Sequence, residues 1–175
     1  TRSELAGRVS GHAQQLPTAI DHETCLYLLI DPTWAMQEKA NGERRTLQIN
    51  GGQVQGVNKL GLLVDVPEHW VAEFGHLFSA DIDGEQVGDE FFAFDLLRLG
   101  DLDLRGESFD TRYKTLESLI ETHQPILRTL RLLRASMNQA DKRKAFDAIK
   151  ATSGEGVVFK MRSAPYDAGR SRASL

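Results

Sequence analysis

The sequence predicts an α+β fold built on antiparallel sheet, in a single domain that spans residues 1–175. Two observations carry this prediction. Short apolar segments separated by Gly and Asn fill the first part of the chain, as strands and hairpins require. Helical spacing of apolar residues appears only later. The chain has 175 residues, 41% hydrophobic and 26% charged, a composition typical of one globular domain with a core of its own.

The early segments expected to form strands are apolar and short. They are WAMQEK (34–39), RRTLQI (44–49), VQGVNKLGLLVDV (54–66), SADIDG (79–84) and EFFAFDLL (90–97). Two turn signals separate them. Asn41-Gly42 predicts a type I′ hairpin, because both central positions of that turn need positive φ, and Asn50-Gly51-Gly52 predicts a second hairpin of the same kind.

Helices are expected in the second half of the chain. The first has one apolar face and ends before Pro125, which cannot continue a helix; that face carries Tyr113, Leu116, Leu119 and Ile120. The segment ILRTLRLL (126–133) fits a strand or a helix, and we favour the strand because it shows no clear polar face. The segment 139–151 predicts another helix, with Asp141 as its cap and a buried stripe of Ala145, Phe146 and Ile149.

The C-terminal part adds one more strand and a tail. Residues 153–156 (SGEG) predict a turn that leads into the strand VVFKM (157–161). The tail YDAGRSRASL (166–175) is small and polar and predicts a loop or frayed end.

Charge and cysteine content exclude several classes of protein. The formal net charge of −4 argues against a strongly basic nucleic-acid clamp, although a local basic patch stays open. The single cysteine, Cys25, is expected in the core and cannot form an internal disulfide, which indicates a reducing compartment. The five histidines, at 12, 22, 69, 76 and 123, lack metal-ligand spacing. Without a long apolar run or a signal-peptide pattern, we expect a soluble cytoplasmic protein.

Three stretches place ionisable or aromatic residues at turns or strand ends, from which their side chains could point into a binding site. They are Lys39 beside Asn41-Gly42, the run Asp83-Gly84-Glu85 with the aromatic strand that follows it, and EGVVFK (155–160). Each has an ordinary structural explanation: a hairpin lysine, a turn, a core strand, and a weak surface pair of Glu155 with Lys160. Their occurrence together, in this order, favours a shared site.

This order resembles the covalent nucleotidyltransferase superfamily of ATP-dependent DNA ligases, RNA ligases and mRNA capping enzymes. Its signature Lys-x-Asp/Asn-Gly-x-Arg reads here as KANGER (39–44). DIDGE (81–85) is similar to the family's acidic element, FFAFDLL (91–97) to its base-stacking motif, EGVVFK (155–160) to its Glu-Gly-x-x-x-Lys element, and YDAGR (166–170) to the segment that often follows. The resemblance runs from about Leu16 to Arg170. It implies an adenylation domain of the DNA ligase type, with antiparallel sheets flanked by helices, similar to ATP-grasp folds.

The resemblance implies that ATP and Mg²⁺ are the cofactors and that Lys39 is the catalytic nucleophile. Its amine would attack the α-phosphorus of ATP to give lysyl–AMP. A lysine attacks only when neutral, so Lys160 and Mg²⁺ would have to lower the pKa of Lys39. Glu85 and Glu155 would hold Mg²⁺, directly or through water, or a ribose hydroxyl.

Other residues would bind the nucleotide. Phe94 would stack on the base, and Phe92 shares its face by strand alternation. Gln37 would read the adenine amino group, beside Glu38, which is assigned to the same nucleotide site. Arg44 would face the nucleotide or an incoming 5′-phosphate. We further expect Asn58-Lys59 near the nucleotide and Lys142-Arg143-Lys144 on a solvated helix face, with contact to a phosphate backbone left open.

Two departures from the family leave alternatives open. Asn41 replaces the commoner Asp, and Lys160 is the last lysine, so the family's terminal Lys-x-Lys strand and the OB-fold domain are expected to be missing from residues 1–175. The leading prediction is a DNA ligase adenylation domain, monomeric and away from membranes. It would act on nucleic acid with 5′-phosphate and 3′-hydroxyl ends, with nicked duplex DNA preferred and RNA possible. An RNA ligase of the repair type and a noncatalytic nucleotide-binding module are the alternatives, and a capping enzyme is less favoured.

Overall fold

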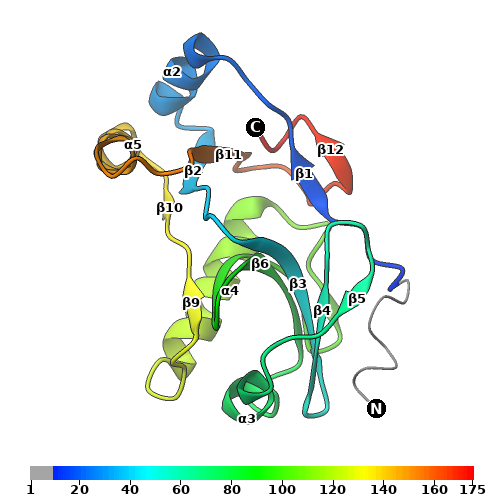
Figure 1. Ribbon diagram of the computed structural model, residues 1–175. Helices are drawn as coiled ribbons and strands as arrows, with labels where there is room; N and C mark the ends of the chain where they lie inside the picture. The colour runs from blue at the N-terminus through cyan, green and yellow to red at the C-terminus, as the bar shows by residue number, and fades with distance from the viewer. Residues whose placement is uncertain (1–9) are drawn as a thin grey trace.

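The computed structural model describes residues 10–175 and contains three sheets (Figure 1). Residues 1–9 lie outside this described part. No helix within residues 10–175 combines the length and apolar character needed to cross a membrane. The mixture of antiparallel sheet with few helices confirms the predicted α+β class.

The largest sheet is curled and almost wholly antiparallel. Its strands follow the order β5-β4-β3-β6-β7-β8, and the bounds are β3 (Glu43–Asn50), β4 (Gln53–Val57), β5 (Leu63–Val64), β6 (Ala80–Val87), β7 (Glu90–Leu99) and β8 (Leu102–Asp103). A short strand, β9 (Leu130–Leu132), adds to β7 in parallel. The strand predicted over 126–133 is therefore only three residues long, because Thr129 and Arg128 instead donate their backbone N–H groups to the Glu73 carboxylate.

The main core lies on one face of this sheet. Alternate strand residues such as Leu47, Ile82 and Phe91 are fully buried there against α3 (His69–Phe74) and α4 (Phe109–His123). The apolar face predicted for α4 is buried, and the helix ends two residues before Pro125. Helix α3 was not predicted from the sequence; it has six residues and is anchored by the fully buried Trp70.

A second sheet has the order β10-β2-β11, with β2 (Trp34–Glu38) between β10 (Ala135–Ser136) and β11 (Val157–Met161). The helices α2 (His22–Ile30) and α5 (Gln139–Ala151) pack beside it, as Figure 1 shows at the upper left. The small core between them is built on five buried residues: Leu28, Leu29, Trp34, Met36 and Phe159. Cys25 packs against this core while half-buried.

The C-terminal tail is ordered into a third sheet, which makes the prediction of a frayed end wrong. The strand β12 (Gly169–Ser171) pairs in parallel with β1 (Gln15–Pro17). Leu175 and Phe159 exchange both backbone hydrogen bonds, at 2.6 and 2.8 Å. The partners of the tail lie far away along the chain, so its small polar residues carry no local strand signal.

The predicted hairpin at Asn41-Gly42 is also wrong. The strand before it, β2, belongs to the small sheet, while β3 belongs to the large one, so these residues form a crossing between sheets. Neither has positive φ. The second predicted turn is confirmed: Gly51 and Gly52 have φ of 54° and 84° and join β3 to β4.

The helix predicted over 139–151 is confirmed in its bounds but not in its details. Asn138, rather than Asp141, is the N-cap: its side chain accepts a hydrogen bond from the Asp141 N–H. Lys142, expected on a solvated face, is fully buried. Its ammonium donates to the carbonyl oxygens of Leu28, Asp31 and Trp34 at 2.7, 2.6 and 3.0 Å, and so joins the C-terminal end of α2 to the start of β2.

We expect Lys142→Met to lower the free energy of unfolding by about 2–4 kcal/mol, because three buried carbonyl oxygens lose a charged donor. Urea denaturation measures this loss. The matched control is Lys144→Met on the exposed side of α5, for which we expect a change within about 0.5 kcal/mol. Equal effects of the two substitutions would refute the capping role of Lys142.

Candidate active site

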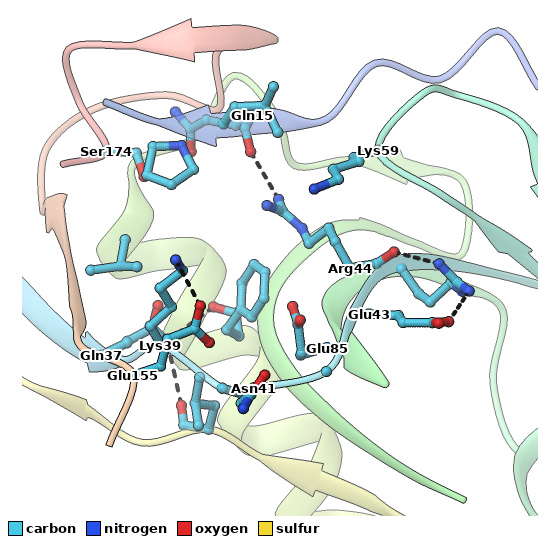
Figure 2. Close-up of a pocket in the computed structure, with 18 of the residues that line it drawn as sticks. Gln15, Gln37, Lys39, Asn41, Glu43, Arg44, Lys59, Glu85, Glu155 and Ser174 are labelled. Atoms are coloured by element: carbon cyan, nitrogen blue, oxygen red, sulfur yellow. Dashed lines mark hydrogen bonds and ion pairs between the residues drawn. The ribbon is translucent and has the colours of Figure 1, made fainter. Parts of the chain in front are cut away.

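The three sheets enclose one cleft of about 620 Å³ (Figure 2). All of the predicted site residues except Phe92 line it: Gln37, Glu38, Lys39, Arg44, Glu85, Phe94, Glu155 and Lys160. Asn58 and Lys59 line it too. The sequence did not predict the roof of the cleft, which comes from the third sheet through Gln15, Leu16, Pro17 and Arg170, and from Ser174 beyond β12. Only the resemblance of YDAGR to a ligase segment could have indicated Arg170.

Lys39 lies at the end of β2, where pairing with the neighbouring strand fixes its backbone. Its N–H donates to Gly156 O at 2.9 Å, just before β11 begins. This register brings the Lys39 Nζ to 3.0 Å from Glu155 Oε1, as Figure 2 shows. The two side chains are 51% and 38% exposed, so the ion pair contributes little to stability and can open readily. Glu155 therefore pairs with Lys39 and not with Lys160.

Gly42 lets the crossing segment pass close to the large sheet. A Cβ at this position would lie 2.2 Å from Gln86 O and 2.8 Å from Val87 Cγ2. The close approach brings the Gly42 backbone to the Glu85 carboxylate. Burial raises the pKa of Glu85; Arg44 and the Gly42 N–H oppose the rise, and the charge of Glu155 adds to it. Gly42 thus serves a close contact rather than a turn.

Arg44 is held by a buried carboxylate on the neighbouring strand. Its Nε and Nη2 donate to the two oxygens of Asp83 at 2.8 and 2.5 Å, and Nη2 also donates to Gln15 O at 2.9 Å. Asp83 is fully buried. The guanidinium carbon lies 4.8 Å from the ring centroid of Phe94, in a cation–π contact. Arg44 therefore enters the cleft with its orientation already fixed.

Phe94 lies at a bulge in β7. Asp83 pairs with Asp95 and Gly84 with Ala93, which leaves Phe94 without an opposite residue. Phe92 keeps a regular pairing with Glu85 and does not line the cleft. As expected from alternation, Phe92 and Phe94 share the face of β7 opposite the buried Phe91 and Ala93, and Phe94, the preferred stacking residue, is the one that lines the cleft.

Lys160 forms part of the cleft wall and is 5% exposed. Its Nζ lies 5.1 Å from the Phe94 ring centroid. Burial lowers the pKa of Lys160 to about 8, against the opposing charge of Asp95. Asp95 itself is paired with the buried Arg112 at 2.8 Å, so its charge is already shared.

Gln37 is 2% exposed, and its amide is oriented by backbone groups. The Nε2 donates to Phe94 O at 3.2 Å and to Leu133 O at 3.4 Å. With Nε2 engaged in this way, Oε1 is the atom left to accept a hydrogen bond from a ligand in the cleft.

The cleft carries carboxylates that could bind Mg²⁺ together with water and the phosphates of a ligand, without a metal site built from protein side chains alone. Within residues 10–175 no three His, Cys, Asp or Glu side chains gather as a metal cage. Glu85 and Glu155 do line the same cleft, and their charges interact. Mg²⁺ is commonly held by one or two carboxylates together with water and substrate phosphates, which this pair suits.

Residues 63–175 match the model of the family described as the ATP dependent DNA ligase domain. The chain belongs to this family. The match covers more than half of the chain and confirms the resemblance found in the sequence. No curated protein matches the ligase domain at a significant level.

Solved structures share the fold of this ligase domain. A mycobacterial DNA ligase D complexed with ATP and MES matches with a TM-score of 0.74 and 23% identity, over 95% of this chain and 60% of that one. The ligase domain of M. tuberculosis LigD gives 0.73 and 22%, over 95% and 59%. A Lig E DNA ligase gives 0.67 and 20%, over 94% and 67%. The domain thus spans about 60% of the length of the first two.

We expect Gly42→Ala to destabilise the ligase domain by about 2 kcal/mol, because the added methyl group collides with the backbone of Gln86. Thermal unfolding measures the effect. Gly106→Ala is the control, since a Cβ there meets no atom within 4 Å. A Gly42 variant as stable as the Gly106 variant would contradict the close approach.

Lys160 should make stability depend on alkaline pH. Its pKa is about 8 in the folded domain against 10.5 for a free lysine, so the unfolded chain binds more protons between these values. The free energy of unfolding should therefore rise by up to about 3 kcal/mol as pH increases through this window, relative to Lys160→Met. Urea denaturation at several pH values tests this. Parallel profiles for the two proteins would rule out a lowered pKa.

Proposed function

We propose that this domain is the adenylation domain of an ATP-dependent DNA ligase, which forms lysyl–AMP at Lys39. It then transfers AMP to a 5′-phosphate, so that a 3′-hydroxyl can displace it and seal a nick. The observation that carries the proposal is the convergence of Lys39, Phe94 and two carboxylates, Glu85 and Glu155, on one cleft. These residues come from four separate stretches of the chain.

The base is held by Phe94 and Gln37. Phe94 offers an aromatic face on which adenine stacks. The Oε1 of Gln37 accepts a hydrogen bond from the adenine amino group, since Nε2 already serves two carbonyl oxygens. Guanine presents a carbonyl oxygen at the corresponding position, which cannot donate. The arrangement therefore supports adenine over guanine.

The phosphates lie between the cationic groups. Lys160 and the Nη1 of Arg44 face the triphosphate, and Lys39 attacks the α-phosphorus once it separates from Glu155 and loses a proton. An N–P bond forms, the bond from the α-phosphorus to its bridging oxygen breaks, and pyrophosphate leaves. Mg²⁺, held by Glu85 and Glu155, would neutralise the charge that develops on the phosphates.

A nicked DNA duplex is the proposed substrate. The family match and the DNA ligases that share the fold support DNA over the RNA of a repair-type RNA ligase. The noncatalytic alternative would need Lys39 to be inert. Its placement in the same cleft as Phe94, Arg44 and Lys160 supports a reactive role instead.

Incubation with α-labelled ATP and Mg²⁺, followed by denaturing electrophoresis, tests the covalent step. We expect a label that survives denaturation in the parent protein and falls at least 100-fold in Lys39→Ala, because the proposed attacking amine is removed. Lys144→Ala is the matched control and should retain full labelling. A label that persists in Lys39→Ala would disprove the assignment.

The substrate is tested separately with matched nicked duplexes of DNA and RNA. The proposal predicts preferential sealing of DNA by the full-length protein. Equal sealing of both would remove the preference for DNA, and sealing of RNA alone would establish the RNA ligase alternative.

A further inference from the structure

Tyr166, in the YDAGR segment, occupies a position that the proposed chemistry does not use. The side chain is 7% exposed. Its hydroxyl donates to Asp83 Oδ2 at 2.7 Å and accepts from the Gln15 N–H at 2.8 Å. Its backbone N–H donates to Arg105 O at 2.9 Å. A residue of the C-terminal segment thus contacts the carboxylate that holds Arg44.

These contacts close a ring of four residues. The Tyr166 hydroxyl bonds to Asp83, Asp83 to Arg44, Arg44 Nη2 to Gln15 O, and the Gln15 N–H returns to Tyr166. Each member comes from a different part of the chain. The ring therefore connects the third sheet, through Gln15, to β3 and β6 of the large sheet.

The charges and hydrogen bonds of these residues determine the protonation states of Asp83 and Tyr166. Burial alone would raise the pKa of Asp83, but the charge of Arg44 and the hydrogen bonds from Arg44 and Tyr166 hold that pKa below its usual value. Burial, followed by the charge of Asp83, raises the pKa of Tyr166, so its hydroxyl stays protonated and remains a donor. Asp83 is thus a carboxylate with donors on both oxygens.

The ring determines which atom of Arg44 reaches a ligand. Its Nε and Nη2 are engaged by Asp83 and Gln15, while Nη1 makes no hydrogen bond within residues 10–175. The guanidinium plane also lies against Phe94, at 4.8 Å. Only Nη1 remains for a phosphate.

We propose that Tyr166 is a positioning residue for Arg44, holding the guanidinium through Asp83 so that Nη1 faces a phosphate in the cleft. The proposal rests on the proposed adenylation function. Without the hydroxyl, Asp83 Oδ2 loses a donor and Arg44 gains freedom to rotate out of the cleft. A charge-assisted hydrogen bond of this kind corresponds to about ten-fold in affinity.

Tyr166→Phe removes the hydroxyl oxygen and keeps the aromatic group of the side chain. In the full-length protein we expect the KM for ATP in self-adenylation to rise about ten-fold, with kcat within about three-fold of the parent. Tyr113→Phe is the matched control, because its buried hydroxyl also accepts a hydrogen bond from a backbone N–H, that of Ala135 at 2.9 Å, and lies outside the ring of four hydrogen-bonded residues. It should lose similar thermal stability and keep its KM within about two-fold. Similar KM values for the two variants would overturn the proposal.

A double-mutant cycle separates positioning from general stabilisation. In an Arg44→Lys background, where the two-pronged contact with Asp83 is absent, Tyr166→Phe should raise the KM less than about two-fold further. An undiminished effect there would contradict action through Arg44.

A readout without ATP keeps this test independent of the proposed function. The hydrogen exchange rate of the Arg44 Nε–H, assigned by ¹⁵N NMR through its loss in Arg44→Lys, should be slow in the parent and in Tyr113→Phe. It should be at least about ten-fold faster in Tyr166→Phe. Unchanged exchange overturns the positioning role. Absence of labelling in the parent would instead refute the adenylation function alone.

Discussion

The buried ion pair of Arg44 and Asp83 is the contact on which the cleft depends. Removing one partner of such a pair from a protein interior typically costs about 3–5 kcal/mol, because the remaining charge has no water around it. Burial favours the neutral form of Asp83, and the charge of Arg44, at 2.8 and 2.5 Å, is the main cause that keeps the pKa of Asp83 below its usual value. This pairing keeps β3 and β6 in register, which places Glu85 opposite Arg44. It also draws the third sheet over the cleft, because Gln15 and Tyr166 complete the hydrogen bonds of the pair.

A second constraint is that the chain changes sheets between Lys39 and Glu43. The small sheet fixes Lys39 beside Gly156, and the large sheet carries Glu85 and Phe94, so the cleft lies where the two meet. Gly42 makes this crossing possible by passing within contact of Gln86. Lys39 is 51% exposed, whereas Gln37 and Lys160 are buried. This division suits the proposed nucleophile, which would meet first a nucleotide and later a nucleic-acid end.

Much of the site could be predicted from the sequence, because its residues recur in a recognisable order along one chain. The long helices were also predictable, since α4 and α5 carry clear apolar spacing. What failed depends on tertiary contacts. The bulge at Phe94 arises from pairing with β6, and alternation alone cannot show it. Lys142 resembles any surface lysine until three carbonyl oxygens surround it. The tail becomes ordered only through partners on β1 and β11.

The central claim is that one cleft binds the nucleotide and supplies the lysine that captures it. A crystal structure of the protein incubated with ATP and Mg²⁺ tests this claim most directly. We expect continuous density between the Lys39 Nζ and the α-phosphorus, with adenine against the Phe94 ring and its amino group at Gln37 Oε1. AMP attached to another residue, or a nucleotide bound outside the cleft, would contradict it.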